Sequence, residues 1–142
     1  MLKFFKIEDE NRIIGAIRAA EERTSGEIRV HLEDKCKGNI LEEAQRAFLK
    51  LKMNETAQRN GVLIFIAPSR KEFAIVGDKG INEVVPENFW EAERDLMQQH
   101  FRNEQFAEGI ALALHQIGMK LREFFPIQED DENELPDEIS YG

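Results

Sequence analysis

The sequence predicts a three-layer α/β/α sandwich, in which helices cover both faces of a mixed sheet of three to four strands. Apolar residues recur at helical spacing in several segments, and a strand of alternating polarity precedes a wholly apolar strand. A helical segment connects these two strands, and a strand, a helix and a strand in this order form a unit whose strands are parallel. We expect two helices on each face, because the four predicted helices then cover the sheet most economically.

The N-terminal half supplies the two parallel strands. A first helix is expected over residues 8–23, with acidic residues in its first turn, where the helix dipole favours them. Residues 27–33 alternate polar and apolar side chains, which indicates a strand buried on one face. Residues 41–51 follow helical spacing, and residues 62–67 are wholly apolar, as is typical of a central strand.

The C-terminal half adds a third strand and two helices. Residues 72–76 are predicted to form a hairpin with the preceding strand and so to run antiparallel to it. Pro86 is suited to the first turn of a helix, which is expected to extend to Phe101. A last helix over residues 105–125 carries an apolar stripe until Pro126 ends it. The pattern does not place a fourth strand.

Length and charge divide the chain into one domain and a tail. The 142 residues are enough for one domain with a hydrophobic core, which we place at residues 1–126. Residues 127–142 contain acidic but no basic residues, so most of the net charge of −9 lies there. We expect a disordered, solvated tail, with docking to a partner as the alternative, because Leu135, Ile139 and Tyr141 offer apolar contacts.

Composition argues against several classes of protein. The single cysteine, Cys36, cannot form an internal disulfide, and the N-terminus lacks the apolar stretch of a secretory signal. The longest apolar run, residues 62–67, is too short to span a bilayer. The domain without its tail is nearly neutral, so it should not attract nucleic acid. We therefore expect a cytoplasmic monomer that neither enters a membrane nor binds nucleic acid.

The sequence contains no familiar motif for covalent or nucleotide chemistry. His31, His100 and His115 are widely separated and form no zinc motif, and nothing indicates a base beside Cys36. A nucleophile elbow, a Walker loop and a dinucleotide-binding glycine motif are all absent from the sequence. We interpret each histidine as an ordinary, partly exposed residue and predict no catalytic residue.

An oxygen-rich loop after the third strand contains side chains that are suited to a hard cation. Residues 77–88 contain glycines together with Asp78, Asn82 and Glu87, whose side-chain oxygens are suitable ligands for Ca²⁺ or Mg²⁺. The antiparallel third strand ends at the edge of the sheet where Glu27 begins the first strand, so Glu27 is a further candidate. The alternative is a capped turn without a metal, in which Glu87 only favours the start of a helix.

Four segments of the chain resemble the TPM domain, in its compact form without signal peptide or membrane anchor. Together they extend over about residues 8–126, and they comprise Thr24–Val30, Arg59–Phe65, Phe73–Ile81 and Phe101–Gly109. The resemblance implies an α/β/α sandwich with divalent-cation binding by loops at one edge of the sheet. In the secreted branch of the family, two acidic residues of this loop fall near Asn82 and Glu87 of the present chain, and Asp78 is additional.

Two functions remain open from the sequence. We prefer a Ca²⁺- or Mg²⁺-binding interaction module with a protein partner, which the resemblance connects with protein or membrane-protein maintenance. The alternative is a metal-dependent acid phosphatase acting on phosphomonoesters, because plastid members of the family carry that label and a cation can polarise a phosphoryl oxygen. The module is preferred because the sequence indicates no positioned nucleophile or base. The predicted metal ligands are Asp78, Asn82, Glu87 and Glu27.

Overall fold

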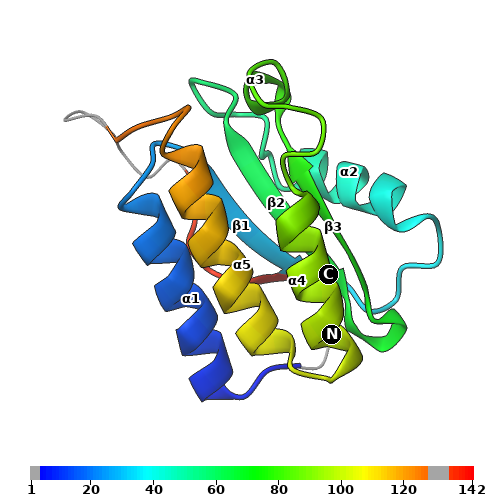
Figure 1. Cartoon of the computed structure of the whole chain (residues 1–142). Helices are drawn as coiled ribbons and strands as arrows, with labels where there is room; N and C mark the ends of the chain where they lie inside the picture. Colours follow the sequence, from blue (N-terminus) through cyan, green and yellow to red (C-terminus); the bar gives the residue numbers. More distant parts are fainter. Residues whose placement is uncertain (1–3, 128–134) are drawn as a thin grey trace.

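The computed structural model describes residues 4–127 and 135–142, which form a mixed sheet with helices on both faces (Figure 1). The helices are α1 (Ile7–Glu21), α2 (Ile40–Lys50), α3 (Lys79–Asn82), α4 (Glu91–Arg102) and α5 (Phe106–Leu121). The strands are β1 (Glu27–Leu32), β2 (Gly61–Ala67), β3 (Glu72–Gly77) and β4 (Ser140–Tyr141), arranged in the order β3-β2-β1-β4. The predicted α/β/α sandwich is confirmed.

Strand pairing brings three strand ends to one edge of the sheet. β1 and β2 are parallel, with Glu27 opposite Gly61. β3 is antiparallel to β2, with Gly77 opposite Val62. The start of β1, the start of β2 and the end of β3 therefore lie side by side, as the sequence predicted.

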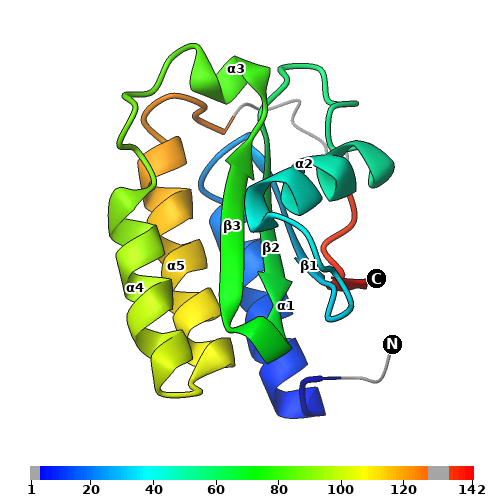
Figure 2. The same cartoon turned by 90° about the vertical axis from the view of Figure 1, so that its right-hand side faces the viewer.

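The helices are distributed unequally over the two faces, contrary to the expectation of two on each. α1, α5 and α4 pack side by side on one face, and α2 alone covers the other (Figure 2). The alternation of β1 explains the difference. Its side chains toward the three helices are fully buried and apolar: Ile28, Val30 and Leu32. Those on the face of α2 are polar and require less apolar cover: Glu27, Arg29 and His31.

The helix predicted from Pro86 begins later, at Glu91, because the intervening residues form a turn that is anchored to α5. Phe89 and Trp90 in this turn are each 7% exposed. The ammonium group of Lys120 in α5 donates to the carbonyl oxygen of Phe89 and lies over its ring. The two aromatic residues thus belong to the core without being helical.

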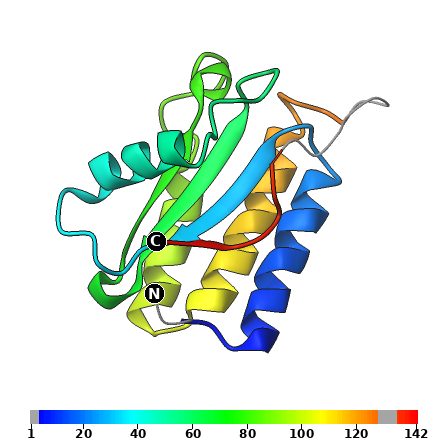
Figure 3. The same cartoon turned by 180° about the vertical axis from the view of Figure 1, so that it is seen from behind.

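The end of the chain differs from the disordered tail that the sequence predicted. β4 runs parallel to β1, with Ser140 opposite His31, and the red segment in Figure 3 lies along β1. Leu135 and Ile139 are each 8% exposed, so both are part of the core. The part of the predicted tail from residue 128 to residue 134 lies outside the described residues. Residues 135–142 therefore pack on the domain instead of being solvated.

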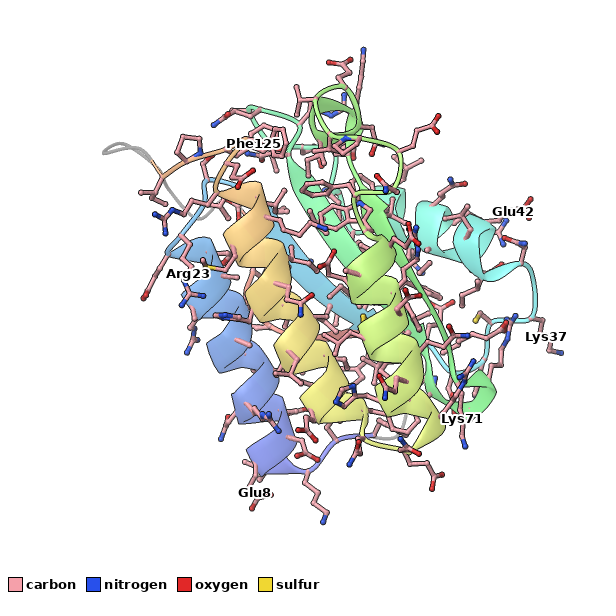
Figure 4. The ribbon with its side chains drawn as sticks, in the orientation of Figure 1. Glu8, Arg23, Lys37, Glu42, Lys71 and Phe125 are labelled. Carbon is pink, nitrogen blue, oxygen red and sulfur yellow. The ribbon has the colours of Figure 1, made fainter. Side chains whose placement is uncertain are left out.

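Charged side chains extend outward around the molecule. Glu8, Lys37, Glu42 and Lys71, labelled in Figure 4, are exposed and point away from the sheet. No helix in the described part of the chain combines the length and apolar character needed to cross a membrane.

Candidate cation pocket

Asp78 is fixed at the end of β3 by hydrogen bonds on both sides. Its backbone N–H donates to the carbonyl oxygen of Gly61 in β2 at 2.9 Å. Its carboxylate Oδ1 accepts the backbone N–H of Lys79 at 2.7 Å and so caps α3, a short helix in the segment predicted as a loop. Asp78 is only 5% exposed. The residue predicted as the first metal ligand is thus largely buried.

Arg59 holds both oxygens of this carboxylate. Its Nε donates to Oδ2 of Asp78 at 2.7 Å and its Nη2 donates to Oδ1 at 2.9 Å, the two-pronged geometry that suits a guanidinium and a carboxylate. The hydrogen bond with Asp78 raises the pKa of Arg59. The backbone of Arg59 is also fixed, because its carbonyl oxygen accepts the N–H of Gly80 at 2.9 Å. The carboxylate therefore already faces a positive charge.

Asn82 and Glu83 lie at the other end of α3. The side-chain amide of Asn82 donates to the carbonyl oxygen of Gly77 at 3.0 Å, which folds Asn82 back toward the end of β3. The carboxylate of Glu83 lies 3.9 Å from the ammonium group of Lys79, an exposed pair one helical turn apart. Both Asn82 and Glu83 are exposed. The short helix α3 thus gathers oxygen-bearing side chains around Asp78.

These residues line an open pocket of about 450 Å³ between α2 and α3. One part of its lining is apolar and comes from α2 and β3: Phe48, Leu49 and Val76. The other part is charged or polar, including Arg59, Asp78, Lys79, Asn82 and Glu83. The pocket can therefore accommodate an ion or a polar group beside an apolar one.

Glu87, the third predicted ligand, lies in a different depression. It lines a cavity of about 250 Å³ together with Pro86 and Phe89, and Asn82 lies between this cavity and the larger pocket. Glu87 itself is exposed. The structure thus brings Asp78 and Asn82 together but leaves Glu87 outside their pocket.

Glu27, the fourth predicted ligand, shares the sheet edge with Asp78 but is separated from it by another backbone segment. Gly61 lies between the two residues: Glu27 in β1 is opposite Gly61 on one side, and Asp78 at the end of β3 donates its backbone N–H to Gly61 on the other. A Cβ atom on Gly61 would lie 2.8 Å from the carbonyl oxygen of Met53, so the backbone at Met53 fills the space over Gly61. Glu27 is 3% exposed. It is not part of the pocket.

Glu27 instead lies near another acid, the half-buried Glu21 at the end of α1. Burial raises the pKa of Glu21 to about 10, with further contributions from the hydrogen-bonded side chain of Asp137 and from the charge of Glu27. Oε2 of Glu21 also accepts the backbone N–H of Ile28 at 3.0 Å. Within residues 4–127 and 135–142, no group of three or more His, Cys, Asp or Glu side chains is arranged to hold a metal ion.

Sequence reasoning missed Arg59 and Glu83. Arg59 belongs to a polar segment that reads only as a turn, and it lies 19 positions before Asp78 in the sequence. Its strand-edge position could have been inferred from its place directly before β2, because the start of β2 adjoins the end of β3. Glu83 follows Asn82 directly, and a helical reading of residues 79–82 would have placed it one turn from Lys79.

A second polar cluster attaches the end of the chain to β1. Nδ1 of His31 lies 2.7 Å from Oγ of Ser140, and Nε2 lies 3.2 Å from the carboxylate of Glu33. This order of groups resembles a Ser-His-acid triad. His31 is however buried, not partly exposed as predicted, and its ring packs on that of Phe65, so burial lowers its pKa. Because Oγ of Ser140 also hydrogen-bonds the Val30 carbonyl, we assign the cluster to the docking of β4.

The fold and the pocket define a small α/β/α domain with a polar opening at one edge of its sheet. A family model of the TPM domain matches residues 2–120. The chain belongs to the TPM domain family. No curated protein sequence matches it.

Similar solved structures include the following two. The solution structure of BA42 from the psychrophilic bacterium Bizionia argentinensis is 44% identical, with a TM-score of 0.94, and the match covers 100% of this chain and 98% of BA42. The N-terminal domain of the cg2496 protein from Corynebacterium glutamicum is 17% identical, with a TM-score of 0.57 over 98% of this chain and 80% of that one. The second similarity concerns the fold alone.

Proposed function

We propose that this TPM domain is a binding module that takes a divalent cation, Ca²⁺ or Mg²⁺, in the pocket at the end of β3. The observation that carries the proposal is the gathering of oxygen-bearing side chains in one open pocket: Asp78, Asn82 and Glu83. Carboxylate and amide oxygens are the ligands that hard cations prefer. The proposal retains Asp78 and Asn82 from the sequence and replaces Glu87 and Glu27 by Glu83.

The expected affinity is low. Three side chains supply fewer oxygens than the six to eight that surround Ca²⁺, so water must complete the shell. Asn82 and Glu83 are exposed and must lose side-chain freedom on binding. We therefore expect a dissociation constant of about 10⁻⁴ to 10⁻³ M, as in loosely built calcium sites.

A protein partner is the second part of the proposal. Leu49 is 62% exposed beside the polar end of the pocket, and Phe48 and Val76 continue the same apolar lining. An apolar side chain of a partner would fit beside the bound cation. We place the module in the cytoplasm, because its single cysteine, Cys36, is free and buried.

The alternative is a metal-dependent phosphatase, to which the word phosphatase in the name of the family model points. Arg59 and Lys79 favour it, because two cations beside Asp78 could hold a phosphoryl group. The residues described as lining the pocket include no Ser, Thr, Cys or His, which favours binding over covalent catalysis.

The experiment is a Ca²⁺ titration of the full chain, followed by backbone amide shifts. We expect changes at residues 77–83, which Asp78→Asn should abolish and Glu87→Gln should leave intact. Changes confined to residues 129–138 would instead make the acidic segment the cation site. A parallel assay with an aryl phosphate and Mg²⁺, Ca²⁺ or Mn²⁺ should give no turnover in the usual enzymatic range of about 1–1000 s⁻¹. Metal-dependent turnover that Asp78→Ala removes would establish the phosphatase.

A further inference from the structure

We propose that the guanidinium group of Arg59 is an internal competitor for the cation site, so that a divalent cation must displace it from Asp78. The inference rests on the cation function proposed above and adds a mechanism of regulation to it. It predicts that Arg59, and not the general charge of the pocket, sets the cation affinity.

The competition follows from the geometry of the carboxylate. Both oxygens of Asp78 accept N–H groups of Arg59, at 2.7 and 2.9 Å, and Oδ1 also accepts the backbone N–H of Lys79. A Ca²⁺ ion would approach the same oxygens to about 2.3–2.6 Å. Guanidinium and metal ion would then occupy the same side of a carboxylate that is only 5% exposed. Because the two cations repel each other and need the same oxygens, the binding of one weakens the binding of the other.

Arg59 has the freedom to leave without disturbing the fold. Its side chain is 45% exposed, so the released guanidinium can be solvated. Its backbone stays in place, because the Gly80 N–H donates to its carbonyl oxygen. A Cβ atom on Gly80 would also collide with the backbone of Arg59, so the two segments pack without a gap. The expected movement is therefore a side-chain rotation.

The gain in cation affinity depends on the fraction of molecules in which Arg59 has left Asp78. A cation that binds only the open form has its affinity reduced by the fraction of molecules in that form. If the ion pair is open for about a tenth of the time, its removal raises the cation affinity about tenfold.

Lys79 provides a matched control in the same pocket. Its side chain pairs with Glu83 at 3.9 Å, but the two side chains are 72% and 61% exposed, so solvent screens this pair and it hardly restrains Glu83. Only the backbone N–H of Lys79 contacts Asp78. Lys79→Gln thus removes one positive charge from the pocket without removing a side chain from the carboxylate. Arg59→Gln removes the same charge and the competitor together.

The experiment compares Ca²⁺ titrations of the wild type, Arg59→Gln and Lys79→Gln, at constant ionic strength. Binding is followed by calorimetry and by amide shifts, with Asp78→Asn to identify the site. In the wild type, the NMR chemical shift of the Nε–H group of Arg59 is followed as well. It should move toward the value of a solvent-exposed arginine as Ca²⁺ binds. We expect Arg59→Gln to bind about tenfold more tightly than the wild type and Lys79→Gln to change the affinity by less than about twofold.

Each of the other outcomes would refute either the competition by Arg59 or the cation function itself. Equal affinities of the wild type and Arg59→Gln, or equal gains in both variants, would refute the competition while leaving the cation function intact. No binding sensitive to Asp78→Asn in any of these proteins would refute the proposed function itself. If Arg59→Gln does not fold, Arg59→Lys should show a smaller gain, because an ammonium group cannot hold both oxygens. An Arg59 signal that does not move while Ca²⁺ binds at Asp78 would also refute the competition.

Discussion

Glu93 shows how one buried charge is accommodated. It is 1% exposed on α4, and its carboxylate lies 2.8 Å from the ammonium group of Lys120 on α5. Lys120 also lies 4.4 Å from the centre of the Phe89 ring. One lysine therefore joins α5, α4 and the turn that precedes α4, and that turn lines the smaller cavity that contains Glu87.

We predict that Lys120→Met destabilises the protein by about 3 kcal/mol, because it leaves Glu93 buried without its counter-ion. Urea unfolding of the variant and the wild type measures this loss. Lys71→Met is the control, since the pair of Lys71 and Glu104 is exposed and 3.9 Å long, and its loss should change stability by less than about 1 kcal/mol. Equal effects of the two substitutions would show that the Glu93 pair is not a buried one in solution.

The C-terminal segment that carries β4 contributes to stability through its buried side chains. We predict that deletion of residues 135–142 reduces the free energy of unfolding by about 3 kcal/mol or more, since it removes the buried side chains Leu135 and Ile139. Thermal and urea unfolding of the shortened chain provide the measurement. Ile139→Ala should reproduce part of the loss, whereas Leu41→Ala, at a 49% exposed position, should not. An unchanged stability would restore the sequence-based expectation of a dispensable tail.

The docking of the same segment should depend on pH through Glu21. Its pKa rises from 4.5 to about 10 on folding, so between these values the unfolded chain releases a proton that the folded chain retains. The free energy of unfolding should therefore fall as the pH rises through this window. The charged groups that face Glu21 are Glu27 on β1 and Asp137 beside β4, and Arg18 pairs with Asp137 at 3.5 Å.

Unfolding measured across this pH range tests the prediction. Glu21→Gln should flatten the curve, because the amide imitates the protonated acid and can still accept the N–H of Ile28. Glu22→Gln, at the exposed neighbouring position, should retain the dependence of the wild type. A wild-type curve that stays flat through the window would mean that Glu21 is ionised in the folded protein as it is in the unfolded chain.

Across the chain, local patterns were sufficient for β1, β2 and β3 and for most of the helices. The alternation in β1 and the apolar run of β2 specify which faces are buried, and both are continuous in sequence. β4 has only two residues, Ser140 and Tyr141, so no periodicity could reveal it. Its position depends on long-range contacts such as the hydrogen bond of 2.5 Å from Tyr141 to Glu10.

Only the part of the candidate site that is local in sequence was predicted. Asp78 and Asn82 lie within one turn of chain, so their proximity follows from local sequence. The pairing of Asp78 with Arg59 requires the neighbouring strand, and the separation of Glu27 from Asp78 requires the backbone of Met53. Neither contact has a local signature. Sequence therefore identified the edge of the sheet but not the residues that complete or close the pocket.

The position of β4 also determines an order of events during folding. His31 pairs with Phe65 in β2, 34 residues away, and with Ser140 in β4, 109 residues away. Closing the longer loop costs about 1 kcal/mol more chain entropy, so β1 should join β2 before it joins β4. Pulse-labelling by hydrogen exchange should accordingly protect the amides that link β1 and β2 earlier than that of Gly142, which donates to Leu32 at 2.7 Å. Until then β1 is an edge strand open to neighbouring chains, so a partly folded population should aggregate through this edge.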